Sequence, residues 1–249
     1  MNVNKIKLKT LQQVQMERLG KMVDFDDVHI KLARAARTLA RLKRPMLDSL
    51  KEHYGDLERD DFLWHYLLQS FATMGNISGW KGLIQNDANY RQITYDTLAK
   101  VPAASRLKHT LEICTNAKIR YPQKKAKYII GCFEKIHNIG GQKAAKKALF
   151  EQLGCEGKIN FLKKFPGIGD KYARNTMMDV YHDEFRESIA IDSRIEAISK
   201  EWKLSFKSYN AHEQFYLDVA CDACLEGWEL DRLMFRFQAV FYPPITISE

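Results

Sequence analysis

Apolar residues recur along most of the chain at the spacing of about 3.6 residues that marks an amphipathic helix. The stripe Val28, Leu32, Ala35, Leu39 and Leu42 shows the pattern, because its steps alternate between four and three residues. The alternation of apolar and polar residues that favours strands is almost absent. The chain is therefore expected to be all-α, with helices over residues 11–22, 27–43, 60–73, 104–116, 124–137, 142–152, 158–164, 171–181, 193–202, 211–225 and 229–240.

Length and composition narrow the class of protein. The 249 residues, of which 45% are hydrophobic and 28% charged, can bury a core, which excludes a disordered or collagen-like chain. No uncharged apolar run approaches the roughly 20 residues needed to cross a bilayer, and the N-terminus lacks the apolar segment of a signal peptide. We therefore expect a soluble, intracellular protein. Cys221 and Cys224, the one Cys-x-x-Cys pair, are interpreted as two buried residues of one helix rather than a metal site.

Positive charge is concentrated in two segments of a chain whose net charge is +8. Residues 1–51 hold 12 Lys and Arg against 5 acidic residues, residues 118–147 hold 9 against 1, and the rest of the chain is net negative. In the first segment the arginines run beside the apolar stripe, where a solvated helix face is favoured over a contact with DNA or a membrane. In the second, a Tyr-Pro turn leads into Lys124, Lys125 and Lys127 at a helix start. We expect Lys124 and Lys125 to face phosphates.

The most informative stretch runs from Ile159 to Asn175. A short apolar helix meets a Pro-Gly-Ile-Gly turn, and a second helix follows at once. Glycines on both sides of the isoleucine let the backbone turn sharply and expose its N–H groups, while the isoleucine anchors the turn in the core. The start of the second helix adds unpaired N–H groups and the positive end of its dipole. An anion such as a DNA phosphate is the expected ligand of Pro166, Gly167, Ile168 and Gly169.

This stretch resembles the helix-hairpin-helix motif, which also occurs as a bare DNA anchor. In base-excision DNA glycosylases related to endonuclease III, a nucleophilic lysine follows the hairpin after one residue, and an aspartate opens a helix about twenty residues later. Lys171 occupies the first position, and Asp192 the second, 21 residues on. The resemblance implies that the Lys171 amine attacks the sugar C1′ and forms a Schiff base, while Asp192 stabilises the developing positive charge. A phosphate contact for Lys171 and a plain helix N-cap for Asp192 are the alternatives.

Two further segments resemble these glycosylases. Residues 121–129 are similar to a helix start upstream of their hairpin, and residues 64–73 to the first core helix, whose end places the wedge that fills the gap left by a flipped nucleotide. The resemblance implies a six-helix core over residues 58–177 and a second helical lobe over residues 1–57 and 178–249. DNA and the active site are expected in the cleft between the two lobes. The wedge candidates are Phe71, Met74 and Asn76.

The resemblance also bears on cofactors. The endonuclease III branch carries a four-cysteine pattern that binds an iron–sulfur cluster, and this pattern is missing after Asp192. Neither a cluster nor another bound metal centre is therefore expected. A monovalent cation at the carbonyl groups of the hairpin is expected, as in relatives.

The last helix indicates a substrate. Residues 230–235 resemble the Leu-Asp-x-x-Leu-aromatic stretch of short, cluster-free 8-oxoguanine DNA glycosylases known chiefly from archaea. By this resemblance Asp231 accepts a hydrogen bond from the flipped base and Phe235 stacks on it, although both positions also fit a plain core helix. We expect a monomer that acts on double-stranded DNA holding a damaged base, as an 8-oxoguanine glycosylase with abasic-site lyase activity. A glycosylase for oxidised pyrimidines or mismatches, and a non-catalytic DNA-binding protein, are the alternatives.

Overall fold

The computed structural model describes residues 25–75 and 77–245, and all regular secondary structure in these ranges is helical. The all-α prediction is confirmed. The helix predicted over residues 11–22 lies outside the described residues. The α-helices are α2 (Phe25–Leu42), α3 (Arg44–Leu50), α4 (Phe62–Thr73), α5 (Ser78–Leu83), α6 (Asp87–Gln92), α7 (Tyr95–Lys100), α8 (Ala103–Asn116), α9 (Pro122–Ile139), α10 (Gln142–Phe150), α11 (Gly154–Leu162), α12 (Asp170–Met178), α13 (Ser193–Glu201), α14 (Tyr209–Asp222) and α15 (Gly227–Arg236). The 3-10 helices are η1 (Lys51–Glu58), η2 (Asp183–Phe185) and η3 (Gln238–Phe241).

Four α-helices, α3, α5, α6 and α7, are not predicted from the periodicity. Helix α3 has seven residues and the other three have six each, which is too short for an apolar stripe to repeat. Local capping helps to define two of them, because the side chains of Asn86 and Thr94 accept hydrogen bonds from the backbone N–H groups of Asn89 and Thr97.

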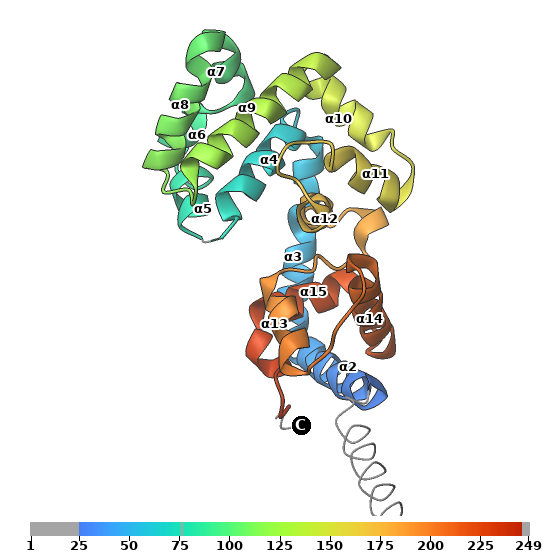
Figure 1. The fold of residues 1–249 in the computed structure, drawn as a ribbon. Helices are drawn as coiled ribbons and strands as arrows, with labels where there is room; N and C mark the ends of the chain where they lie inside the picture. The colour runs from blue at the N-terminus through green and yellow to red at the C-terminus, as the bar shows by residue number, and fades with distance from the viewer. Residues whose placement is uncertain (1–24, 76, 246–249) are drawn as a thin grey trace, which may run out of the picture.

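The helices form two groups, with α12 lying between them (Figure 1). Helices α4 to α11 make up the upper group in this view, and α4 is central to it, since it packs on α5, α9, α10 and α12. In the lower group α2 lies along α14 and α15. Helix α12 packs on both α4 and α11. The domain limits at residues 58 and 177 stay a prediction.

Helices α2 and α3 are held to α15 by apolar packing and by charge. Four residues of the predicted apolar stripe of α2 are buried, whereas Leu42, the last residue of the helix, is 60% exposed. The Glu229 carboxylate accepts hydrogen bonds from Arg44 at 2.6 Å and from Lys51 at 2.9 Å. Burial opposes ionisation of Glu229, but these hydrogen bonds prevail and lower its pKa. Part of the basic charge of the N-terminal segment is therefore neutralised within the fold.

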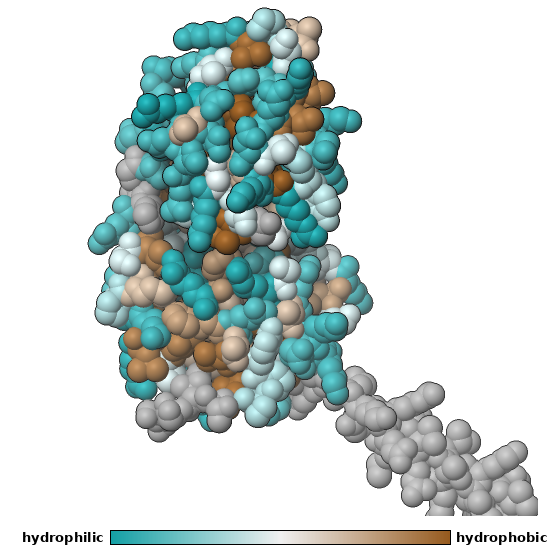
Figure 2. Space-filling view, turned by 90° about the vertical axis from the view of Figure 1, so that its left-hand side faces the viewer, coloured by the Kyte–Doolittle hydropathy of each residue, from teal (hydrophilic) through white to brown (hydrophobic). Residues whose placement is uncertain are grey.

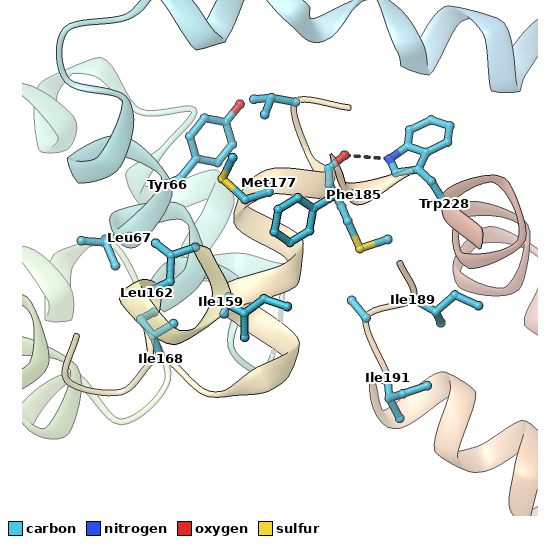
Figure 3. Close-up of a cluster of buried hydrophobic side chains, with 14 of the residues drawn as sticks. Tyr66, Leu67, Ile159, Leu162, Ile168, Met177, Phe185, Ile189, Ile191 and Trp228 are labelled. Carbon is cyan, nitrogen blue, oxygen red and sulfur yellow. Dashed lines mark hydrogen bonds between the residues drawn. The ribbon is translucent and has the colours of Figure 1, made fainter. Parts of the chain in front are cut away.

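A buried cluster joins the two groups of helices (Figure 3). Tyr66 and Leu67 of α4 lie near Met177 of α12, on the side where the hairpin also packs. Trp228 of α15 approaches from the other side and donates a hydrogen bond from its indole Nε1 to the carbonyl oxygen of Met178 at 2.7 Å. This bond ties the end of α12 directly to the lower group.

The interpretation of the cysteine pair is wrong. Cys221 and Cys224 are both exposed, and they do not share a helix, since α14 ends at Asp222 and Cys224 lies beyond it with a left-handed φ of 58°. Among residues 25–75 and 77–245, no group of three or more His, Cys, Asp or Glu residues is arranged to hold a metal ion.

The described helices also lack a membrane-spanning candidate: none is both long and apolar enough to cross a bilayer. On the face drawn in Figure 2, hydrophilic residues cover most of the upper part of the molecule, and apolar residues gather on the lower part.

The Trp228 hydrogen bond gives a first prediction. Trp228→Phe removes the indole donor, leaves the Met178 carbonyl with only the backbone N–H of Tyr181, and replaces a buried ring by a smaller one, so the free energy of unfolding should fall by about 1–3 kcal/mol. The half-buried Trp80 is a matched control, and Trp80→Phe should cost less than about 1 kcal/mol. Urea denaturation followed by circular dichroism measures both. Equal losses of the free energy of unfolding in the two variants would show that the Trp228 hydrogen bond does not hold the two groups of helices together.

Candidate active site

A cleft of about 640 Å³ opens where the end of α4, the start of α12, the start of α13 and the middle of α15 meet. This volume is in the usual range for a ligand pocket. Lys171, Asp192, Asp231 and Phe235 all line it. The fold therefore brings together four predicted site residues that are spread over 65 positions of the sequence.

Lys171 is the second residue of α12 and is half-buried in the cleft wall. Its Nζ lies 4.0 Å from the centre of the Tyr172 ring, and no hydrogen bond or ion pair to this amine is found within the described part of the chain. Burial lowers the pKa of Lys171, although the negative charges of nearby Asp192 and Asp179 oppose the shift. A larger share of the amine is therefore neutral, and nucleophilic, than in an exposed lysine.

Asp192 is the N-cap of α13 and faces the same cleft. Its Oδ1 accepts the backbone N–H groups of Arg194 at 2.8 Å and Ile195 at 3.0 Å. Its Oδ2 lies 3.8 Å from the guanidinium of Arg194. The cap fixes one carboxylate oxygen by backbone geometry and leaves the other to interact with charge in the cleft.

The hairpin between α11 and α12 is locked against α9. Gly167 has a left-handed φ of 82°, and a Cβ at this position would lie 2.4 Å from the ring of Tyr128. Ile168 is buried, as predicted, and its N–H donates to the carbonyl of Phe165 at 3.1 Å. Gly169 differs, because its φ is −106° and a Cβ there would meet no atom within 4 Å. Only the first of the two hairpin glycines is thus required by the backbone.

The two lysines predicted to contact phosphate have different environments. Lys124 is exposed, and its Nζ lies 5.6 Å from the centre of the Tyr128 ring, which places it beside the hairpin. The prediction for Lys125 is wrong: its side chain is buried, and its Nζ donates to the carbonyl oxygen of Phe71 at 3.1 Å. Burial lowers the pKa of Lys125 to about 8. Lys125 thus ties α9 to the end of α4 rather than facing solvent.

The three wedge candidates also differ in their environments. Phe71 is completely buried and packs beside Tyr128, so it is a core residue and not a wedge. Met74 is half-buried against the core, and Asn76 lies outside the described residues. The sequence reasoning missed Ile77, which is 58% exposed and lines the cleft. An apolar residue in the loop just after α4 was the available signal.

Asp231 and Phe235 lie on the wall formed by α15. Asp231 is buried, its Oδ1 accepts the N–H of Ala190 at 2.9 Å, and burial raises its pKa to about 6. Phe235 is 46% exposed, and the guanidinium of Arg194 lies 3.9 Å from the centre of its ring. One face of the ring is therefore already covered.

Gln69, Asp179 and Arg232, which also line the cleft, form a polar network with Asp231 that the sequence does not predict. Arg232 lies 3.0 Å from an oxygen of Asp179 and 3.5 Å from one of Asp231. Gln69 of α4 donates to the other oxygen of Asp179 at 2.8 Å. The network links α4, α12 and α15 across the cleft floor, and its members are too far apart in sequence for a local motif to reveal them.

Comparison with known proteins identifies the fold. No protein-family model matches the chain, and no curated protein matches it in sequence. The solved 8-oxoguanine DNA glycosylase of Thermotoga maritima matches with 15% identity and a TM-score of 0.63, over 89% of this chain and 100% of that one. The 8-oxoguanine DNA glycosylase of Methanocaldococcus jannaschii matches with 17% identity and a TM-score of 0.62, over 84% of this chain and 95% of that one. This chain has their fold.

The hairpin geometry predicts unequal effects of two glycine substitutions. Gly167→Ala forces a left-handed alanine against Tyr128 and should lower the free energy of unfolding by about 2 kcal/mol or more. Gly169→Ala meets no neighbour and only places a poorer N-cap residue before α12, so it should lower the free energy of unfolding by about 1 kcal/mol or less. Chemical denaturation of both variants tests this, and a tolerated Gly167→Ala would mean that Tyr128 does not lock the turn.

Proposed function

We propose that the protein is a DNA glycosylase of the helix-hairpin-helix superfamily that also cuts the strand at the resulting abasic site. The observation that carries the proposal is the Lys171 amine, which lies in the cleft with a lowered pKa beside Asp192. The spacing of these two residues after the hairpin resembles that of the lysine-dependent glycosylases. The fold shared with two solved DNA glycosylases supports the same assignment.

The proposed reaction begins with attack of the neutral Lys171 amine on C1′ of the damaged nucleotide. The bond between C1′ and the base breaks, and the base leaves with a proton. Asp192 stabilises the positive charge that develops on the sugar and helps to move protons. The attacking nitrogen then loses a proton and the C1′–O4′ bond of the sugar ring breaks as O4′ takes one up, which leaves a Schiff base between the nitrogen and C1′. Loss of the C2′ proton then expels the 3′ phosphate by β-elimination.

Double-stranded DNA is the proposed partner. The hairpin supplies the backbone N–H groups of Gly167 and Gly169 at the start of α12, and the exposed Lys124 adds a positive charge beside them. Lys125 is withdrawn from this surface. The monomeric state, the intracellular location and the monovalent cation at the hairpin remain predictions.

The proposed substrate is 8-oxoguanine. Asp231 and Phe235 share one wall of the cleft, where the first is a hydrogen-bond acceptor and the second is an exposed ring. This pairing suits a flat base with N–H groups on its edge. Both solved relatives are 8-oxoguanine glycosylases. An oxidised pyrimidine or a mismatched base is the alternative, and a panel of duplexes decides between them.

Covalent trapping tests the reaction. With borohydride present, wild type should form a protein–DNA adduct on a duplex holding 8-oxoguanine, and on one holding an abasic site. Lys171→Gln should form none, because it lacks the amine. Lys143→Gln is the matched control, since Lys143 is an exposed residue of α10 that pairs with Asp60, and it should trap as wild type does. If wild type traps on neither duplex, the lyase activity is excluded, and release of the damaged base then decides between a glycosylase without it and a non-catalytic DNA-binding protein.

The lowered pKa of Lys171 predicts the pH dependence of trapping. Only the neutral amine attacks, so the rate should rise with pH and level off below the ordinary lysine pKa of 10.5. Asp192→Asn removes a negative charge that stabilises the ammonium form, so its profile should shift to lower pH while its plateau rate falls. Initial trapping rates on an abasic-site duplex, measured with cyanoborohydride across pH 5–11, check both statements. A plateau only above about pH 10.5 would contradict them.

A further inference from the structure

The segment that carries Asp192 has an unusual set of hydrogen bonds. Residues 188–191 lead from η2 to α13 without belonging to a helix, and their backbone is buried. Three successive N–H groups are bound by side chains of the lower group of helices. The N–H of Ile189 donates to Oε1 of Glu213 at 3.1 Å, that of Ala190 to Oδ1 of Asp231 at 2.9 Å, and that of Ile191 to the hydroxyl of Tyr209 at 2.9 Å.

These bonds determine where Asp192 lies. A buried N–H group without a partner is costly, and this segment has no neighbouring strand to supply one. The side chains of α14 and α15 therefore act as the partner that a sheet would otherwise provide. Asp192 is the next residue along the chain, so its position follows from how these groups hold the segment.

Glu213 differs from the other two acceptors because it is also bound to the helix of the nucleophile. Arg174 of α12 donates from Nε to Glu213 Oε1 at 2.8 Å, and its Nη2 lies 2.6 Å from Oε2. Both side chains are buried. Arg174 is three residues after Lys171, one turn further along α12. Its guanidinium also lies 4.5 Å from the centre of the Tyr209 ring.

We propose that Glu213, held in place by Arg174, is a positioning residue that fixes the Asp192 carboxylate relative to the Lys171 amine. One carboxylate binds the backbone of the segment that carries Asp192 and the guanidinium on the helix of Lys171. The two reacting groups thereby share a single buried connection. This inference rests on the proposed function, because it assigns Glu213 a part in the same reaction.

Glu213→Gln is the test variant. The amide keeps the shape of the side chain, but its NH2 group faces a guanidinium N–H, so one half of the bidentate pair becomes two opposed donors. The rate of Schiff-base formation on an abasic-site duplex, at saturating protein, should fall about tenfold or more. The affinity for the same duplex without borohydride should stay within about twofold, since the Glu213 side chain is buried and cannot contact DNA itself.

A double-mutant cycle distinguishes positioning from a general loss of stability. If Glu213 acts through Asp192, adding Glu213→Gln to Asp192→Asn should slow trapping by less than about threefold further. If it acts independently, the full effect of Glu213→Gln should reappear in that background. The second result overturns the proposal.

Glu156→Gln is the matched control. Glu156 is a second carboxylate near the guanidinium of Arg174, at 3.9 Å, but its side chain is 71% exposed and it makes no bond to the segment before Asp192. Its removal should leave the trapping rate within about twofold of wild type. A loss of trapping rate as large as that of Glu213→Gln would show that the charge around Arg174 matters and the hydrogen bond to Ile189 does not. That result overturns the proposal.

Tyr209→Phe keeps the test decisive if Glu213→Gln unfolds. It removes only the hydroxyl, which accepts the Ile191 N–H and donates to the Ile189 carbonyl oxygen at 3.3 Å, and it should slow trapping without changing the affinity for the duplex. Melting temperatures identify any variant that is unfolded. Absence of trapping by wild type itself would end the proposed function. If wild type traps normally, and Tyr209→Phe and any folded Glu213→Gln trap at the same rate, the positioning role of Glu213 is overturned while the proposed function stands.

Discussion

The buried ion pair between Arg174 and Glu213 is the constraint on which the cleft depends. Each charge is removed from water, and breaking such a pair by removing one partner costs about 3–5 kcal/mol, because the other charge is left buried alone. Helix α12 and the segment before Asp192 therefore cannot shift independently. The indole of Trp228, bound to the carbonyl at the end of α12, restricts the same junction from the other side.

The charges around Lys171 are balanced so that its amine is only moderately perturbed. Burial favours the neutral amine, whereas Asp192, Asp179 and Asp231 favour the ammonium form. Arg232 lies within 3.5 Å of both Asp179 and Asp231, which offsets their negative charge. The floor of the cleft thus holds several carboxylates while burial still lowers the pKa of Lys171. Arg232 is far from Lys171 in sequence, so its contribution is visible only in the fold.

The sequence predicts the fold and the central pair of site residues more reliably than it predicts their surroundings. Helices longer than two turns leave an apolar repeat, whereas α5 to α7 are too short to do so. Lys171 and Asp192 belong to local motifs, so their positions follow from nearby residues.

The errors at Phe71 and Lys125 have one cause. Both lie where α4 and α9 meet, and they contact each other there through the Phe71 carbonyl. Lys125 also falls on the same helical face as the buried Ile129, Cys132 and Ile136, so the period of 3.6 residues already indicated that its side chain points inward. The residue type of Lys125 favours solvent, but its position on the helix decides, because a lysine can be buried when a backbone carbonyl accepts its hydrogen bond. The number of basic residues in a segment is therefore only an upper limit on the number of its side chains that can contact a phosphate. In the segment around α9, Lys124 remains beside the hairpin while Lys125 is used to hold the helix that carries the cleft.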